Sequence, residues 1–252
     1  MIKWFTQKPT NTPYTSDNLF HLVGFKHPGD HINNYETLNK ILNDKCVSYS
    51  CKVKGWGETS YVINWNKSLL DEGLIFPKMT CYADIPFSSL DIHVKKYGKF
   101  GVSFKREYLI KFGARPVMYV PLSDNHWGSP FGEKLLLNIE AIYKGFHEHV
   151  AVKNEPLIEK KGRFIGDSPQ NEIQAIDQID KIVAKDFLAF IKPFNSHLDS
   201  THPDNFYMER EWRKLGNLVF NPDDVVKIIV AKGFESQLAK AFPHYKSKII
   251  EI

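Results

Sequence analysis

Cysteine is scarce in this sequence. There are three cysteines, Cys46, Cys51 and Cys81, and they form no CxxC pair and leave an odd one over. A disulfide framework uses cysteines in even numbers, and a structural zinc site uses closely spaced pairs. The cysteine pattern therefore argues against both and favours a reducing compartment.

Familiar catalytic motifs are also missing. The sequence has no P-loop, no GxGxxG, no HExxH and no GxSxG, and its cysteines have no local base. The histidines gather in two groups whose spacings match no standard ligand set. These groups are His21, His27 and His31, and then His126, His147 and His149. We expect no metal site and no serine or cysteine hydrolase.

Long apolar runs are absent as well. No stretch approaches the roughly 20 apolar residues of a membrane-spanning helix, and the first residues lack the apolar core of a signal peptide. With the cysteine pattern, this predicts a cytoplasmic protein that does not enter a membrane. The net charge of +4 is compatible with a nucleic-acid partner without requiring one.

What is present is an ordinary globular composition, with 42% hydrophobic and 25% charged residues over 252 positions. Apolar spacing predicts helices at 33–43, 88–97, 106–112 and 234–242. Short apolar runs predict strands at 18–24, 80–86, 101–104, 116–121, 224–230 and 248–252. Residues 122–205 look like a helical insertion, whose second helix begins at Ser168-Pro169 and stops near Pro193.

The densest polar stretch is Phe206–Arg213, in which two acids, two arginines and three aromatic residues lie close together. Glu209 and Glu211 are spaced i, i+2, which places them on one face of a strand. Carboxylates on one face repel each other, and their pKa values tend to separate. The alternative is an edge strand with a solvated charge ladder, in which Arg213 pairs with one of the two acids.

Glu211 gains a possible chemistry from two earlier residues. A carboxylate can hydrogen-bond a ribose hydroxyl and stabilise the oxocarbenium-like centre that forms when nicotinamide leaves NAD. His21, in the first strand, can hydrogen-bond a ribose hydroxyl, and Tyr82, in a middle strand, can stack on nicotinamide. The alternative is that His21 and Tyr82 are core residues.

Further candidates for the same site come from a helix and from the charged stretch. His93 and Tyr97 are spaced i, i+4 and share a helix face, so they either pack that helix on the sheet or line a cleft. Arg213 is either a partner of the acids or a fork that grips the pyrophosphate of NAD.

Several segments carry a resemblance to a known family. They are Leu19–His21, Cys81–Pro86, His93–Phe104, Pro116–Tyr119 and Glu209–Arg213. In this order they resemble the AbiGi-like family of phage abortive-infection proteins, over residues 18 to 235. Members of that family are described as antitoxin-like components of two-gene systems.

The same layout looks like the ADP-ribosyltransferase fold. The resemblance implies that His21 takes the first position around NAD, that Glu211 is the catalytic glutamate and that Glu209 is the upstream acid. Tyr82 takes the second position, with Ser88 and Ser89 as competitors, because no S-T-S triplet is present. It also implies a single α+β domain over residues 1–252, with a split, mostly antiparallel sheet and the helical insertion.

These expectations predict a phage-defence toxin that transfers ADP-ribose from NAD to a macromolecular acceptor. The favoured acceptor is a base in DNA or RNA, and a separate antitoxin protein would be the partner. One alternative is a non-enzymatic antitoxin or regulator that binds a partner toxin or operator DNA. Another is an NAD glycohydrolase that depletes the cofactor.

Overall fold

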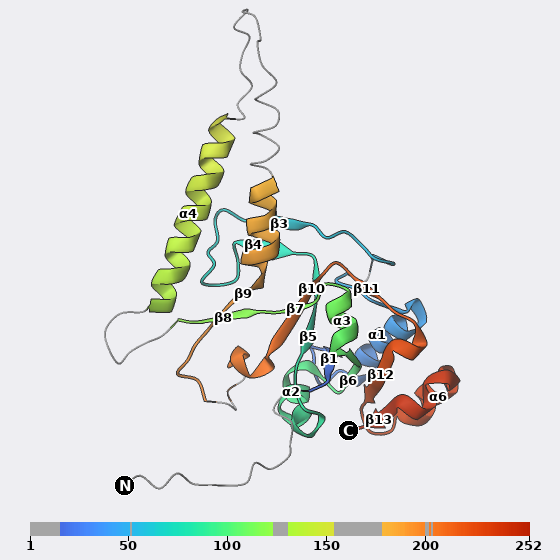
Figure 1. Ribbon diagram of the computed structural model, residues 1–252. Coiled ribbons are helices and arrows are strands. Elements are labelled where there is room, and N and C mark those ends of the chain that lie inside the picture. The colour runs from blue at the N-terminus through green and yellow to red at the C-terminus, as the bar shows by residue number, and fades with distance from the viewer. Residues whose placement is uncertain (1–15, 51, 123–130, 154–177, 200–201, 203) are drawn as a thin grey trace, which may run out of the picture. The chain divides into compact units, whose positions relative to one another are not determined.

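The computed structural model describes residues 16–50, 52–122, 131–153, 178–199, 202 and 204–252 (Figure 1). Contacts divide the chain into two compact units, each assembled from segments that are far apart in sequence. The first unit consists of Met1–Cys46, Cys81–Gly113 and Val219–Ile252, and the second of Val47–Thr80 and Ala114–Leu218. The expected single domain over residues 1–252 stays a prediction.

The first unit is built on a sheet with strand order β13-β12-β6-β1-β5. The strands are β1 (Asn18–Val23), β5 (Met79–Ala83, which begins in the second unit), β6 (Phe100–Lys105), β12 (Val225–Val230) and β13 (Ile249–Glu251). Their pairings are antiparallel except for β12 with β13, which is parallel. The prediction of an α+β protein is confirmed by this mixed sheet and the helices around it.

The helices of the first unit are those that apolar spacing predicts. They are α1 (His31–Asp44), α2 (Leu90–Tyr97), which follows the 3-10 turn η1 (Phe87–Ser89), α3 (Arg106–Lys111) and α6 (Glu235–Ala241), which is followed by η6 (Pro243–Lys248). The Asp30 side chain caps α1 by accepting the Asn33 backbone N–H. Leu90 and Val94 of α2 pack with Phe20 and Ile229 of the sheet in one buried cluster.

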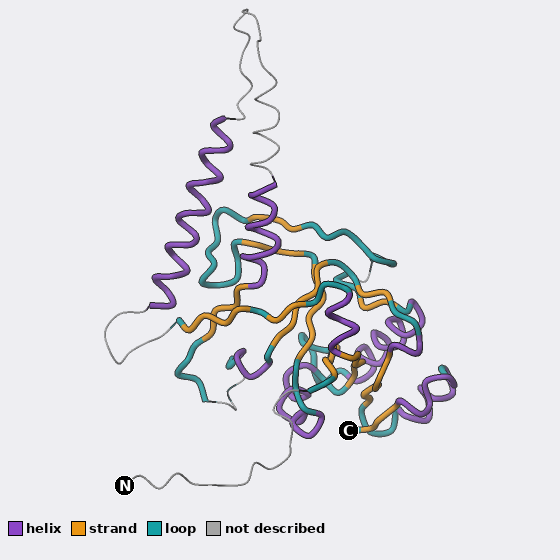
Figure 2. The backbone as a smooth tube through the Cα atoms, in the orientation of Figure 1, coloured by secondary structure: helices purple, strands orange, loops and turns teal. Residues whose placement is uncertain are grey.

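The second unit combines short strands with a long helix. Its elements are β3 (Tyr61–Ile63), β4 (Ile75–Pro77), β7 (Arg115–Pro116), β8 (Met118–Pro121), α4 (Phe131–Lys153), β9 (Ile191–Phe194), η4 (Phe206–Glu209) and β10 (Glu211–Leu215). Two short strands, β2 (Cys46–Val47) and β11 (Leu218–Val219), lie where the chain passes between the units. β8 and β9 run side by side in parallel (Figure 2). Leu136 and Tyr143 of α4 pack into a buried cluster with Leu188 and Phe190.

The helical insertion expected at 122–205 is only partly helical. Residues 131–153 form α4, and residues 178–190 form a helical segment that ends in the π turn η2 (Val183–Phe187) and the 3-10 turn η3 (Leu188–Phe190). The helical segment ends at Phe190 and the strand β9 begins at Ile191, close to the expected stop near Pro193. Proline disfavours the helical conformation in the residue before it, and so the helix ends ahead of it. The expected helix start at Ser168 lies outside the described residues.

The expected strand through Glu209 and Glu211 is also wrong in detail. Glu209 ends the 3-10 helix η4, Arg210 is left-handed with a φ of 42°, and β10 begins only at Glu211. A residue in this conformation interrupts strand geometry. The strand alternation that predicted a shared face for Glu209 and Glu211 therefore does not apply.

Gly101 offers a test of the first unit's sheet. It pairs with Leu22 of β1, and a Cβ at this position would press against the His21 carbonyl oxygen and the Leu22 backbone. We expect Gly101→Ala to lower the free energy of unfolding by about 1–3 kcal/mol, because strand backbone cannot move aside as a side-chain tip can. Urea denaturation measures this.

The matched control is Gly29→Ala, since a Cβ at Gly29 meets nothing within 4 Å. An equal loss of stability in both variants would contradict the close approach of β6 to β1.

Candidate functional site

The charged stretch identified in the sequence lies at a buried ion cluster in the second unit. Glu211 and Arg213 alternate with Trp212 along β10, so their side chains emerge on the same face of the strand, and both are buried. Arg213 Nε donates to Glu211 Oε1 at 2.8 Å. Arg213 therefore pairs with Glu211, but the pair is buried and is not the solvated charge ladder of the sequence alternative.

Lys192 provides the second positive charge. It is in the middle of β9, a short strand that is otherwise apolar, and it is buried. Its Nζ lies 2.5 Å from Glu211 Oε2 and 3.4 Å from Glu209 Oε2. Lys192 is thus a common partner of Glu209 and Glu211, although these two glutamates do not share a strand.

Arg213 extends the cluster to a loop before β4. Its Nη2 donates to Glu72 Oε2 at 2.6 Å, and its Nη1 donates to the Ala189 carbonyl oxygen at 2.7 Å. Glu72 is about one-third exposed, whereas Arg213 is buried. The guanidinium therefore reaches from the interior to the surface, because its N–H donors are spread over three nitrogens, whereas those of a lysine sit on one.

Tyr119 of β8 holds the start of β10. Its hydroxyl oxygen accepts the Glu211 backbone N–H at 2.7 Å. Its ring packs at right angles against Phe194 and edge-on to Tyr207, at centroid distances of 5.9 and 5.2 Å. Burial raises the pKa of Tyr119, so this hydroxyl stays neutral at physiological pH.

The cluster fixes the charge of its central members. Burial by itself raises the pKa of Glu211, but the charges and hydrogen bonds of Arg213 and Lys192 outweigh burial and lower that pKa to about 2. Burial likewise lowers the pKa of Lys192, and the nearby carboxylates, Glu211 first, more than reverse this and raise it. Both groups are therefore charged across the physiological range, far from the pKa of a proton-transfer catalyst.

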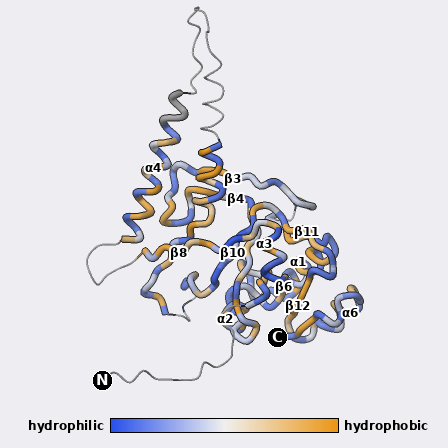
Figure 3. The backbone as a smooth tube through the Cα atoms, viewed as in Figure 1, coloured by the Kyte–Doolittle hydropathy of each residue, from blue (hydrophilic) through white to orange (hydrophobic). Residues whose placement is uncertain are grey.

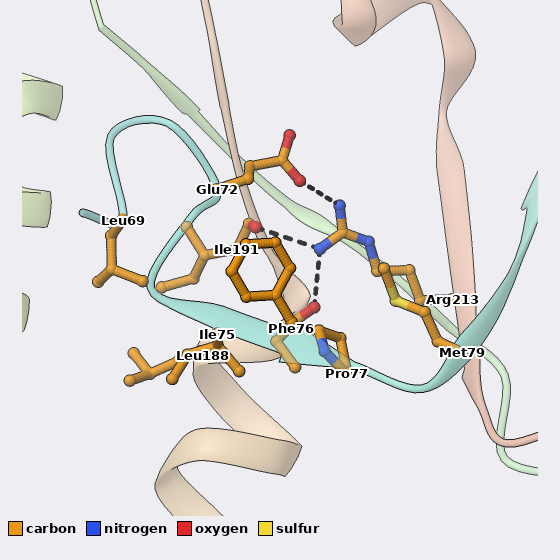
Figure 4. Close-up of a pocket in the computed structure, with 10 residues that line it drawn as sticks. Leu69, Glu72, Ile75, Phe76, Pro77, Met79, Leu188, Ile191 and Arg213 are labelled. Atoms are coloured by element: carbon orange, nitrogen blue, oxygen red, sulfur yellow. Dashed lines mark hydrogen bonds and ion pairs between the residues drawn. The ribbon is translucent and has the colours of Figure 1, made fainter. Parts of the chain in front are cut away.

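A small pocket opens beside the guanidinium (Figure 4). Its volume is about 130 Å³, and apart from Glu72 and Arg213 its lining is apolar, including Ile75, Phe76 and Leu188. Pockets for drug-sized ligands are typically about 300–1,000 Å³. A larger hollow of about 380 Å³ also includes Glu72, together with Phe194, His202 and Phe206.

His21 and Tyr82 lie together in the first unit. Their ring centroids are 5.7 Å apart, and His21 Nδ1 is 2.8 Å from the Cys81 carbonyl oxygen. Burial lowers the pKa of His21, although the bond to Cys81 opposes this. Tyr82 is fully buried against Phe104. Tyr82 thus packs as a core residue and His21 is partly buried, and their assignment to NAD stays a prediction.

The other predicted residues of the first unit, His93 and Tyr97, lie on one short helix in different surroundings. His93 is buried in α2, whereas Tyr97 at its end stacks on Phe25 at a centroid distance of 5.3 Å. Ser88 and Ser89, the competitors of Tyr82, are exposed in η1. His21 and Tyr82 thus belong to the first unit, and Glu211 and Arg213 to the second.

Sequence reasoning missed Glu72, Tyr119 and Lys192. One signal was available for Lys192, because a lysine inside the apolar run Phe190-Ile-Lys-Pro-Phe194 rarely becomes buried without an acidic partner. Nothing local marked Glu72, whose partner is 141 positions away.

Removing Lys192 tests the cluster. Lys192→Met leaves Glu211 and Glu209 buried without their shared cation, and we expect the free energy of unfolding to fall by about 3–5 kcal/mol. Chemical denaturation measures the change. The control is Lys78→Met, which removes an exposed ion pair with Glu58 and should leave stability close to that of the unsubstituted protein.

The lowered pKa of Glu211 predicts an acid dependence. A carboxylate whose pKa is about 2 when folded and 4.5 ordinarily stabilises the protein fully above about pH 4.5, and this stabilisation is lost as the pH falls toward 2. Such a shift corresponds to on the order of 3 kcal/mol. Stability measured from pH 6 to 2 should therefore fall less steeply for Glu211→Gln than for the unsubstituted protein.

The difference in steepness between Glu211→Gln and the unsubstituted protein should persist in 1 M salt, since buried ion pairs are screened less than exposed ones. Parallel curves for the two proteins would refute the role of Glu211.

The part of the chain that the structure describes shows neither a metal site nor a membrane span. Among the described residues, no group of three or more histidine, cysteine or acidic side chains is placed to hold a metal ion. The helices in the described ranges also lack the length and apolar content that crossing a bilayer requires.

Comparison with known proteins gives one match. A family model described as "Putative abortive phage resistance protein AbiGi, antitoxin" matches residues 58–248, about three quarters of the chain. The searches of curated proteins and of solved structures find no match. The matched range includes the cluster around Glu211 and the strand β12. The chain therefore belongs to the AbiGi family of abortive phage resistance proteins.

Proposed function

We propose that this chain is the antitoxin of a two-gene abortive-infection system and that it acts by binding its partner toxin. The observation that carries the proposal is the family match over residues 58–248, whose description names an antitoxin. The same finding overturns the prediction of a toxin that transfers ADP-ribose from NAD, and that prediction was wrong. The non-enzymatic alternative fits the family better.

The surroundings of Glu211 support a role without catalysis. Both of its carboxylate oxygens are engaged, Oε1 by Arg213 and Oε2 by Lys192. A glutamate that stabilises a sugar cation must direct an oxygen at the substrate. Here the oxygens are directed at buried cations of the chain itself, which is the arrangement of a structural ion cluster.

In this proposal, the ADP-ribosyltransferase-like layout is a scaffold without turnover. The mostly antiparallel strands of the first unit and the order of the resembling segments support that assignment. NAD binding is then neither needed nor expected.

Expression in a bacterial host tests the proposal. Cells that express the partner gene alone should stop growing, cells that express this chain alone should grow normally, and co-expression should restore growth. The two purified proteins should elute together from a size-exclusion column after nuclease treatment, which separates protein binding from binding through DNA.

Calorimetry with NAD and an assay for released nicotinamide complete the test. We expect no heat of binding and no nicotinamide release. Growth arrest by this chain alone, or loss of the complex after nuclease treatment, would overturn the proposal.

A further inference from the structure

The helix α4 has apolar residues on two faces. One face, with Leu136 and Tyr143, is buried in the core of the second unit. A surface helix ordinarily has a polar face opposite its buried one. Hydrophobic residues recur along α4 (Figure 3), and several of them, beside the buried face, are exposed.

The exposed residues form a stripe. We call Phe131, Leu135, Ile142 and Phe146 the α4 stripe. Phe131 is 68% exposed, Leu135 50% and Ile142 74%, and Phe146 is half-buried. At 3.6 residues per turn these four positions fall within an arc of about 60°, over a length of about 22 Å. Such a contiguous apolar surface is typical of a protein interface.

The spacing of the α4 stripe is the same in both directions along the helix. The steps from Phe131 are four, seven and four residues. When two copies of α4 lie antiparallel about a two-fold axis between Asn138 and Ile139, Phe131 of each faces Phe146 of the other. In the same arrangement, Leu135 faces Ile142. Self-complementarity of this kind is the requirement of a two-fold symmetric interface.

The neighbours of the α4 stripe permit close approach. Ala141 and Gly145 lie beside it on the exposed side, and a Cβ placed on Gly145 meets nothing within 4 Å. Asn138 lies near the proposed axis, and the exposed Lys134 lies at the edge of this face. A single asparagine in an apolar helix seam can fix the register of two helices.

We propose that the α4 stripe is a dimer interface, and that its occupant is the α4 stripe of a second copy of this chain in antiparallel orientation. The inference rests on the exposure and spacing of α4 and does not depend on the antitoxin proposal. A contact between two helices over about four turns is near the small end of stable interfaces, so the dimer dissociates on dilution.

Sedimentation equilibrium of the full chain tests the interface. The unsubstituted protein should show a concentration-dependent dimer. Ile142→Lys should weaken it at least about tenfold, because a buried contact at the centre is replaced by a charge. The matched control is Leu137→Lys, which changes an apolar residue of similar kind, 44% exposed, on the same helix but outside the α4 stripe. It should keep the dimer.

Both variants should match the unsubstituted protein in far-ultraviolet circular dichroism and in urea midpoint, so that loss of the dimer is not loss of the fold.

Cysteine pairs test the orientation. In the antiparallel dimer Leu135 of one copy faces Ile142 of the other, whereas two Leu135 residues lie about 10 Å apart along the axis. A mixture of Leu135→Cys and Ile142→Cys proteins should therefore form a disulfide-linked heterodimer on oxidation. Each variant alone should form no more disulfide-linked dimer than the unsubstituted protein does.

Three results would overturn the proposal. They are a monomer at every concentration, a dimer that Ile142→Lys does not weaken, and crosslinking of each cysteine variant with itself. If the protein is monomeric and Ile142→Lys abolishes neutralisation by the antitoxin, the α4 stripe binds the toxin instead. The sedimentation and crosslinking results do not bear on whether the chain is an antitoxin, because these two experiments use no partner.

Discussion

The buried carboxylate of Glu211 is the constraint on which the second unit depends. It needs compensating charge from Lys192 on β9 and Arg213 on β10, and Arg213 in turn reaches Glu72 and the Ala189 carbonyl oxygen. These residues come from separate parts of the chain. Because an uncompensated buried charge is strongly destabilising, the cluster tolerates few alternative arrangements of these strands. A buried ion cluster of this kind adds less to the stability of the fold than apolar packing could, but it favours one specific packing of the strands.

That constraint also bears on function. Both carboxylate oxygens of Glu211 are engaged by cations of the chain itself, which agrees with the proposed role as an antitoxin. An antitoxin functions through its surfaces, which must be held in place by a defined interior. In the second unit, Leu136 and Tyr143 anchor α4 in the core, and a neighbouring face of the same helix, with Phe131, Leu135 and Ile142, is apolar and exposed.

Much of the fold follows from local sequence. Tyr35, Leu38, Ile41 and Leu42 predict α1 because helical spacing places them on one face, and all four are buried. The strands at β1, β6 and β12 follow from short apolar runs. The site was less predictable, because the pairing of Arg213 with Glu211 is local, whereas Lys192 and Glu72 reach it only through tertiary contacts. Arg210 shows the same limit, since no local pattern marks its left-handed conformation.

By itself, the sequence determined the α+β class, the family and the presence of a charged stretch at Glu209–Arg213, because each depends on residue order or spacing. Tertiary structure decided what that stretch is. It placed Lys192 against both glutamates and directed Arg213 at Glu72, and it left one face of α4 exposed. The reason is physical: burial sets whether two charges are a solvated surface pair or a fixed internal cluster, and burial is a property of segments that meet only in the folded chain.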